Sequence, residues 1–442
     1  MFIPILNRLL HWFVIGIGTT VMSLMILSKG TSMASLGVVV GLYSSVIVVL
    51  EVPSGILSDR FGRKRIYLLS LGLSILGYGF LVFAEGFWPV LAAFCLLGAA
   101  RAFSSGSIET IFLNEYSRKN GKENLHRLVS AMLAGEAAGL AVGALAGGLI
   151  PIAWNAFFPG TNRYSGNLIV QILILLVLAA FTMSTTRETV IPRDCRSGIG
   201  AQIRESLRPI GDSGILKPML LGFAAWGLCF SSIETYWQPR LRDMLGSDAE
   251  TWIFGLVNAG YFLASLLGVF LANRLLARRR MSYFTFLFAI RLAISAAIVV
   301  LSFQTGVVSF TVVYLVMFLM NGMGGVPENS AFNCELPDDR RSSLLSVASL
   351  AAQLGGIMAS LTFSALVDRL GIPAIWGIAG VLFGLSSFVY LLAGKRSSRI
   401  VMTVPGSHAT IPSGVLDASS AASGAMNENL AGLPAESGPA ER

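Results

Sequence analysis

Long apolar segments recur along most of this chain, and they constrain its fold more than any other feature. A helix needs about 20 mostly apolar residues to cross the hydrocarbon core of a bilayer. Only 13% of the 442 residues are charged, whereas a soluble protein carries roughly a quarter. The sequence therefore predicts an all-α membrane protein with twelve spans. These are 8–28, 34–56, 66–84, 87–112, 128–150, 167–184, 217–238, 252–273, 282–302, 307–327, 344–367 and 372–393.

The positively charged residues are distributed unequally between the two sides of the predicted membrane. If the N-terminus is cytoplasmic, 25 of the 32 Lys and Arg lie on the cytoplasmic side and five lie outside, while Arg101 and Arg291 lie within spans. Lys and Arg are enriched in cytoplasmic loops. We therefore expect a multi-pass protein of the cell membrane with both termini in the cytoplasm. The same bias explains the net charge of +8 without nucleic acid as a partner.

A polar stretch near the middle of the chain divides the spans six and six. Such a linker is a natural boundary between domains. The residues after Arg399 are mainly Ser, Ala, Gly and Pro, and they cannot bury enough apolar surface to become ordered. The expected division is a six-helix bundle, a cytoplasmic linker, a second six-helix bundle and a disordered tail. Their respective boundaries are 1–184, 185–216, 217–394 and 395–442.

Short patterns in the first half return in the second. Gly106-x-x-Glu109 matches Gly325-x-x-Glu328, and the stretch ending in Glu136 matches the one ending in Gln353 at nearly the same separation. Parallel halves of this kind are expected in transporters built from internal repeats. Chance similarity between helices rich in Gly and Ala is the competing explanation.

A short charged link, 55–65, joins the second and third predicted spans. Its order resembles the loop between helices 2 and 3 of the major facilitator superfamily. The resemblance implies two pseudo-symmetric six-helix bundles, secondary transport by alternating access and a role for this link in conformational switching. The alternative is a charged turn that only sets topology. The residues that carry the resemblance are Gly55, Leu57, Asp59, Arg60, Gly62, Arg63 and Lys64.

The fifth predicted span is rich in glycine. Small residues four positions apart allow helices to pack closely within lipid. The stretch also resembles the antiporter motif of bacterial drug–proton exporters of the twelve-helix type, although Ala144 stands where that family usually has proline. We assign a helix-packing role to Gly135, Gly139, Gly143, Gly147 and Gly148.

Three ionisable residues in the first half are candidates for proton coupling. Arg101 resembles the arginine of the helix-4 motif of the superfamily, and Glu109 and Glu136 lie on the same or the next predicted span. Charges at membrane depth are costly, so each needs a partner or a cavity. We expect the three to share a polar cavity that exchanges protons. A static ion pair that only fixes the helices is the alternative.

In the second half, Glu234, Tyr236 and Trp237 near the end of the seventh span are candidates for lining the substrate cavity. The two aromatic residues also suit an interfacial belt, and Glu234 faces either a vestibule or plain water. Glu51 and Glu328 are interpreted as solvated helix ends. Arg291 has no partner that is evident from the sequence.

These features favour proton-coupled efflux of small hydrophobic or amphiphilic compounds, including antibiotics and other drugs. The alternative is a proton-coupled symporter that imports a sugar, an organic acid or a peptide. We find no catalytic set, metal-ligand spacing or nucleotide-binding loop, so neither an enzyme nor a cofactor is expected. The expected partners are a small-molecule substrate, protons and the lipid bilayer, and the protein is expected to act as a monomer. A receptor that does not transport is a further alternative.

Overall fold

A computed structural model of the chain describes residues 1–105, 107–121, 124–187, 215–247, 250–278, 282–336 and 341–396. Most of the predicted linker and the whole of the terminal tail from 400 lie outside these ranges. The helices are α1 (Phe2–Ser28), α2 (Met33–Phe61), α3 (Arg63–Phe83), α4 (Phe87–Ser104), α5 (Ser107–Asn120), α6 (Leu125–Phe157), α7 (Ser165–Thr185), α9 (Leu216–Leu245), α10 (Thr251–Arg278), α11 (Tyr283–Ser302), α12 (Val307–Glu335) and α13 (Arg341–Arg396).

The prediction of an all-α protein with many membrane spans is confirmed. Within the described residues, 11 helical segments are long and apolar enough to cross a membrane. The last of them contains a break at Gly371, where φ is 77°. This positive φ is a conformation that glycine adopts readily and other residues avoid. The break falls between the predicted spans 344–367 and 372–393.

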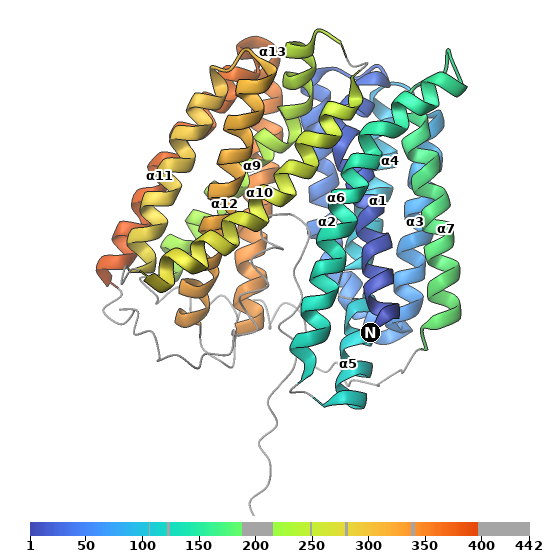
Figure 1. The fold of residues 1–442 in the computed structure, drawn as a ribbon, viewed down its shortest axis with the longest axis horizontal. Coiled ribbons are helices and arrows are strands. Elements are labelled where there is room, and N and C mark those ends of the chain that lie inside the picture. The colour runs from blue at the N-terminus through green and yellow to red at the C-terminus, as the bar shows by residue number, and fades with distance from the viewer. Residues whose placement is uncertain are drawn as a thin grey trace, which may run out of the picture.

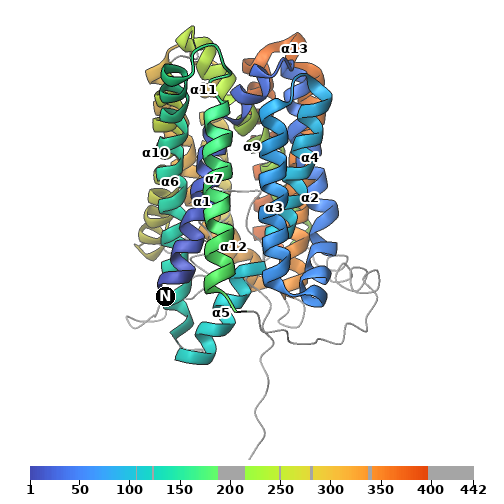
Figure 2. The same cartoon turned by 90° about the vertical axis from the view of Figure 1, so that its right-hand side faces the viewer.

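The helices form two groups that lie side by side (Figure 1). In the first group α1 packs along α6, and α3 packs against α4 and α7. Figure 2 shows α3 and α7 next to each other along their length. In the second group α13 packs against α9 and α11, and α10 packs against α12. Contacts of α6 with α10 and of α2 with α13 join the two groups.

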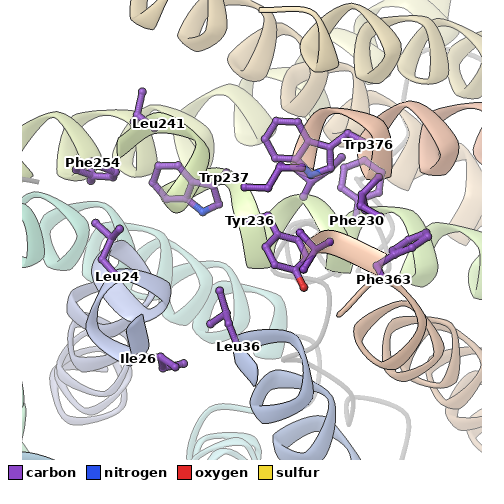
Figure 3. Packing of buried hydrophobic residues seen from close by; sticks show 14 of the residues in the cluster. Leu24, Ile26, Leu36, Phe230, Tyr236, Trp237, Leu241, Phe254, Phe363 and Trp376 are labelled. Atoms are coloured by element: carbon purple, nitrogen blue, oxygen red, sulfur yellow. The ribbon is translucent and has the colours of Figure 1, made fainter. Parts of the chain in front are cut away.

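The apolar core is shared by both groups at one end of the molecule, which is the upper end in Figure 1. Figure 3 shows the side chains that meet there. They include Leu24 and Leu36 from the first group and Tyr236, Trp237 and Phe254 from the second. We call this cluster the shared core.

At the lower end each group has a core of its own. One contains Tyr67, Phe112 and Leu128 and belongs to the first group. The other contains Phe284 and Phe332 and belongs to the second. The two groups are therefore joined by apolar packing at the upper end, whereas the apolar clusters of the lower end stay within one group each.

The charged link 55–65 is not the loop that the sequence suggested. The helix α2 continues to Phe61 and α3 begins at Arg63, so that Gly62 alone connects them. Gly62 has a φ of 99°, and its N–H still bonds to the Ser58 carbonyl at 3.1 Å. The charged residues therefore occupy the last turns of one helix and the first turn of the next, which restricts their directions.

The fourth predicted span, 87–112, is also broken. The helix α4 ends at Ser104, and α5 begins at Ser107. Arg101 lies in the last turn of α4 and Glu109 in the first turn of α5. A cation at a helix C-terminus and an anion at an N-terminus both complement the helix dipole. The prediction that one continuous span, 87–112, contains both residues is therefore wrong.

Candidate functional site

A buried ion-pair centre in the first group is built around Arg8 of α1. Its Nη2 lies 2.8 Å from Glu136 Oε2 on α6, and its Nη1 lies 3.1 Å from Glu109 Oε2 on α5. The Arg8 Nε also donates to Glu136 at 3.0 Å. The side chains of Arg8, Glu109 and Glu136 are 13%, 17% and 6% exposed. One guanidinium thus holds two carboxylates from two other helices.

The sequence analysis expected Glu109 and Glu136 to share a cavity with Arg101, whereas the cation that pairs with both of them is Arg8, which was not among the candidates. Arg8 was counted as a cytoplasmic cation because the first span was predicted to begin there, whereas α1 begins at Phe2. Arg101 forms no ion pair with either glutamate among the described residues. The spacing of Arg8, His11 and Trp12 puts them on one helix face, which is the signal that was available to find the centre.

Further polar groups surround this centre. Asn7 of α1 donates to Thr182 Oγ1 of α7 at 2.9 Å. The Tyr67 hydroxyl of α3 donates to Asn7 Oδ1 at 3.2 Å and lies 3.2 Å from His11 Nδ1. Since buried polar groups normally require partners, these contacts tie α1 to α3 and α7. The centre is therefore embedded in a network that spans most helices of the first group.

A second buried centre lies in the other group, around Arg291 of α11. Its Nη1 is 3.0 Å from Glu328 Oε1 on α12, and its Nη2 donates to the Gly222 carbonyl of α9 at 2.7 Å. The Tyr390 hydroxyl also donates to Glu328. The Arg291 guanidinium lies 4.3 Å from the ring centroid of Phe383. Four helical segments contribute to this centre.

The interpretation of Glu328 as a solvated helix end is wrong. Glu328 is only 7% exposed, and Arg291 is 2% exposed. The predicted span ended at 327, but α12 continues to Glu335. The extra turns keep Glu328 inside the packed part of the helix. Its partner was not evident from the sequence because the two residues come from different helices.

The glycines of α6 lie against α1. A Cβ at Gly135, Gly139, Gly143 or Gly147 would fall on the backbone of successive turns of α1. Gly148 instead faces α10, where a Cβ would lie 2.8 Å from the Thr251 carbonyl oxygen. The Thr251 hydroxyl donates to the Gly148 carbonyl at 2.6 Å. These glycines therefore allow close contact within the first group and, at Gly148, between the two groups.

The three aromatic and acidic candidates on α9 have different direct contacts, although Glu234 acts electrostatically on Tyr314, against which Trp237 packs. Tyr236 points toward α2, since a Cβ on Gly37 would lie 2.7 Å from its hydroxyl. Trp237 packs against Tyr314, with ring centroids 5.5 Å apart. Tyr236 and Trp237 both belong to the shared core. Glu234 is half-buried and forms no hydrogen bond or ion pair within the described ranges.

The charged residues at the α2–α3 junction make contacts on their own side of the molecule. Lys64 Nζ donates to the carbonyls of Met183 and Thr186 at the end of α7, at 2.9 and 2.6 Å. Lysine at a helix C-terminus satisfies carbonyls that lack a partner in the helix. Arg60 lies over the ring of Phe61. The junction is thus linked to the end of α7, where the described part of the first group stops.

One weak polar contact joins the two groups nearer the lower end. Gln353 of α13 donates to Glu51 Oε2 of α2 at 3.5 Å. Glu51 therefore has a neighbour in the second group and is not simply a solvated helix end. No cluster of three or more potential metal ligands occurs among the residues that the structure describes.

Sequence comparison identifies the family. The profile described as Major Facilitator Superfamily matches residues 5–357. The chain belongs to the Major Facilitator Superfamily. It is therefore a multi-pass membrane protein of a family of secondary transporters, and neither family nor fold is that of an enzyme. The resemblance found at 55–65 is confirmed at the level of the superfamily.

Two curated relatives match parts of this superfamily member. An uncharacterized MFS-type transporter of Bacillus subtilis (strain 168), YxaM, is 24% identical over 56% of this chain and 60% of its own length. An uncharacterized transporter of Buchnera aphidicola subsp. Schizaphis graminum (strain Sg) is 30% identical over 22% of this chain and 23% of its own length. The chain thus aligns with less than two thirds of either relative.

Solved transporter structures share the fold over nearly their whole length. The nucleoside transporter NupG has a TM-score of 0.74 at 12% identity, covering 89% of this chain and 98% of its own. A bacterial homolog of the human lysosomal transporter Spinster, inward-facing and unoccupied, has a TM-score of 0.69 at 15% identity, with coverages of 89% and 96%. The peptide transporter PepTSo has 0.70 at 11% identity, with coverages of 89% and 97%. At these identities the similarity concerns the fold alone.

Proposed function

We propose that this protein is a proton-coupled transporter that works by alternating access. The proposed architecture has twelve membrane crossings, because the break at Gly371 divides α13 into two. The first six crossings form the bundle 1–184 and the last six form the bundle 217–394, joined by the linker 185–216. Both termini and the tail 395–442 are placed in the cytoplasm of a cell with this protein in its plasma membrane.

The observation that carries this proposal is the difference between the two ends of the molecule. The shared core joins both bundles at the upper end, and the lower cores are separate. In the proposed topology the upper end is external, so the structure corresponds to a state that is closed to the outside. Rocking of the bundles would separate the upper contacts and bring the lower ends together.

Polar contacts at the upper end suit an interface that opens and closes. Ser23 N–H donates to Gln238 Oε1 at 2.9 Å, and Gln238 Nε2 donates to the Thr19 carbonyl at 2.7 Å. Asn258 Nδ2 donates to Thr20 Oγ1 at 3.0 Å. Each of these hydrogen bonds can be exchanged for a bond to water, so the net cost of separating them is about 0.5–1.5 kcal/mol apiece.

The Arg8 centre supports proton coupling. Arg8 holds Glu109 and Glu136 together, so protonation of one carboxylate leaves the buried arginine paired with the other. A proton can then bind without leaving the buried Arg8 unpaired, and an unpaired buried charge is energetically unfavourable. In this proposal Glu136 and Glu109 exchange the proton, and the α2–α3 junction with Asp59 assists the change between states.

The proposed cargo is a small hydrophobic or amphiphilic compound moved outward, and the glycine pattern of α6 favours this direction. Gly148, which packs on α10 of the other bundle, would then belong to a moving interface. Glu234 is the proposed cavity residue of the second bundle because it is accessible and unpaired among the described residues. Import of a sugar, organic acid or peptide with a proton is the second candidate, favoured by the polar centre alone.

Reconstitution tests the proposal. The purified protein is placed in vesicles that contain a pH-sensitive dye, and lipophilic cations, macrolides, organic acids and sugars are added in turn. In antiport, protons and substrate cross the membrane in opposite directions, and in symport they cross in the same direction. Substrate flux that is independent of an imposed proton gradient contradicts proton coupling. If neither substrate nor protons move for any of the compounds, transport of these classes of compound is contradicted.

A further inference from the structure

Arg101 takes no part in the ion pairs of the Arg8 centre. The carboxylates near it already have partners, since Glu109 and Glu136 bind Arg8 and Glu51 accepts from Gln353. Glu136, Glu51 and the Tyr43 hydroxyl act on Arg101 only electrostatically. Within the described residues Arg101 has no hydrogen bond or ion pair for its guanidinium.

The side chain of Arg101 is also accessible. It lies in the last turn of α4 and is half-buried. An arginine at this depth that faced lipid would cost about 2.5–3.5 kcal/mol on insertion scales. Such residues almost always face the interior of the bundle or a watery cavity. The accessible face of Arg101 is therefore expected to meet water or a ligand.

Trp12 provides an independent observation at the same place. Its indole ring is 0% exposed, and its Nε1 has no hydrogen-bond acceptor among the described residues. The Arg101 guanidinium carbon lies 5.6 Å from the centroid of this ring, and that of Arg8 lies 5.3 Å from it. Buried indole N–H groups normally find an acceptor. The Arg101 guanidinium thus lies against the Trp12 ring, and among the described residues neither the guanidinium nor the indole N–H has a hydrogen-bond acceptor.

We propose that Arg101 and Trp12 form a subsite for the anionic group of an amphiphilic substrate, a carboxylate in particular. This inference rests on the proposed transport function and narrows its substrate class. A carboxylate has two oxygens, which suit the paired N–H groups of a guanidinium. The apolar part of the same molecule would lie against the apolar surface between the bundles. The donors of Arg8 are already used by two carboxylates, whereas no carboxylate among the described residues hydrogen-bonds to Arg101, so its N–H groups remain available to a ligand.

A matched pair of probes tests the subsite. We would measure equilibrium binding of N-dansyl-phenylalanine and of its uncharged amide to the purified protein by dansyl fluorescence. The acid is expected to bind about tenfold more tightly than the amide, as for a hydrogen bond to a charged group. Arg101→Gln is expected to remove that difference by weakening the acid alone, and Arg101→Lys to retain part of it. Trp12→Phe, which keeps a ring but lacks the N–H, is expected to weaken the acid about threefold.

Arg118→Gln is the control because Arg118 is exposed on α5, and it is expected to leave both affinities unchanged. Equal affinity of the wild-type protein for acid and amide overturns the subsite, as does failure of the acid to bind. This comparison needs no variant, so it holds even if an Arg101 variant fails to fold. In the vesicle assay, proton movement driven equally by both probes contradicts the subsite alone. Selective binding of the acid without proton movement contradicts the transport function instead.

Discussion

The two buried arginine centres neutralise their arginines in different ways. The side chain of Arg8 is 13% exposed and pairs with two carboxylates, Glu109 at 17% and Glu136 at 6%, whereas that of Arg291 is 3% exposed and pairs with one carboxylate, Glu328 at 10%. Glu109 and Glu328 occupy matching places in the two halves of the sequence, but their arginines come from α1 and α11. The carboxylate is thus common to both halves, and the rest of each centre is not.

The difference bears on what each centre can do. Protonation of one glutamate beside Arg8 leaves a second negative charge in place. Among the described residues, protonation of Glu328 would leave Arg291 without a paired carboxylate, in contact with the Tyr390 hydroxyl and ring, the Gly222 carbonyl and the Phe383 ring. Breaking a buried pair in this way is strongly unfavourable. We therefore expect the first centre to take part in transport and the second to hold its helices together.

The largest effect is expected from Arg291→Leu. It leaves Glu328 buried without a cation and should lower the free energy of unfolding by about 3–5 kcal/mol. Unfolding in a mixed detergent titration measures the loss. The double variant Arg291→Leu, Glu328→Leu should recover most of it, because an apolar pair needs no compensation. A double variant as unstable as the single one would contradict the role of the ion pair.

Arg8→Leu sharpens the comparison. Glu109 of this centre is partly exposed to water, so the expected loss in the same titration is smaller, about 1–3 kcal/mol. Its main effect should appear as loss of proton-coupled transport in vesicles. If Arg8→Leu destabilises the protein more than Arg291→Leu does, the proposed roles, transport for the Arg8 centre and stability for the Arg291 centre, are wrong.

Glu136→Gln tests coupling directly. The amide cannot carry the proton, so gradient-driven transport should fall by about tenfold or more while substrate binding stays within about twofold. The matched change in the second half, Glu328→Gln, should affect stability first, and the protein that remains folded should still be driven by the gradient. Full gradient-dependent activity in Glu136→Gln would rule out its coupling role.

The smallest effect is expected at the α2–α3 junction. Asp59→Asn should slow turnover by about threefold with unchanged folding, because conformational steps commonly limit such rates. In the second half, Asn273-Arg274 near the end of α10 resembles Asp59-Arg60, and Asn273→Asp serves as the matched control with no expected change. Initial rates in vesicles measure both. Unchanged turnover in Asp59→Asn would indicate that the junction only sets the membrane topology and does not assist the conformational change.

Much of the fold could be predicted because spanning a bilayer is a local requirement. Each segment must be apolar over about 20 residues and must satisfy its own backbone hydrogen bonds. The helix ends were less predictable. α1 and α12 extend beyond their apolar cores, and their polar residues were counted as loops for that reason. The break between α4 and α5 was missed because apolar residues continue on both sides of it, although Ser104-Ser105-Gly106-Ser107 has low helix propensity.

The composition of the sequence thus determined the membrane class and the approximate spans, and the residue order at 55–65 carried the resemblance to the superfamily, since these depend on residues that are neighbours in the chain. The tertiary structure decided which charges meet. Arg8 is 128 residues from Glu136, and Arg291 is 37 residues from Glu328. No local pattern encodes such distances, because a buried ion pair depends on how separate helices pack. The same packing left Arg101 without a carboxylate, and that is the basis of the proposed anion subsite.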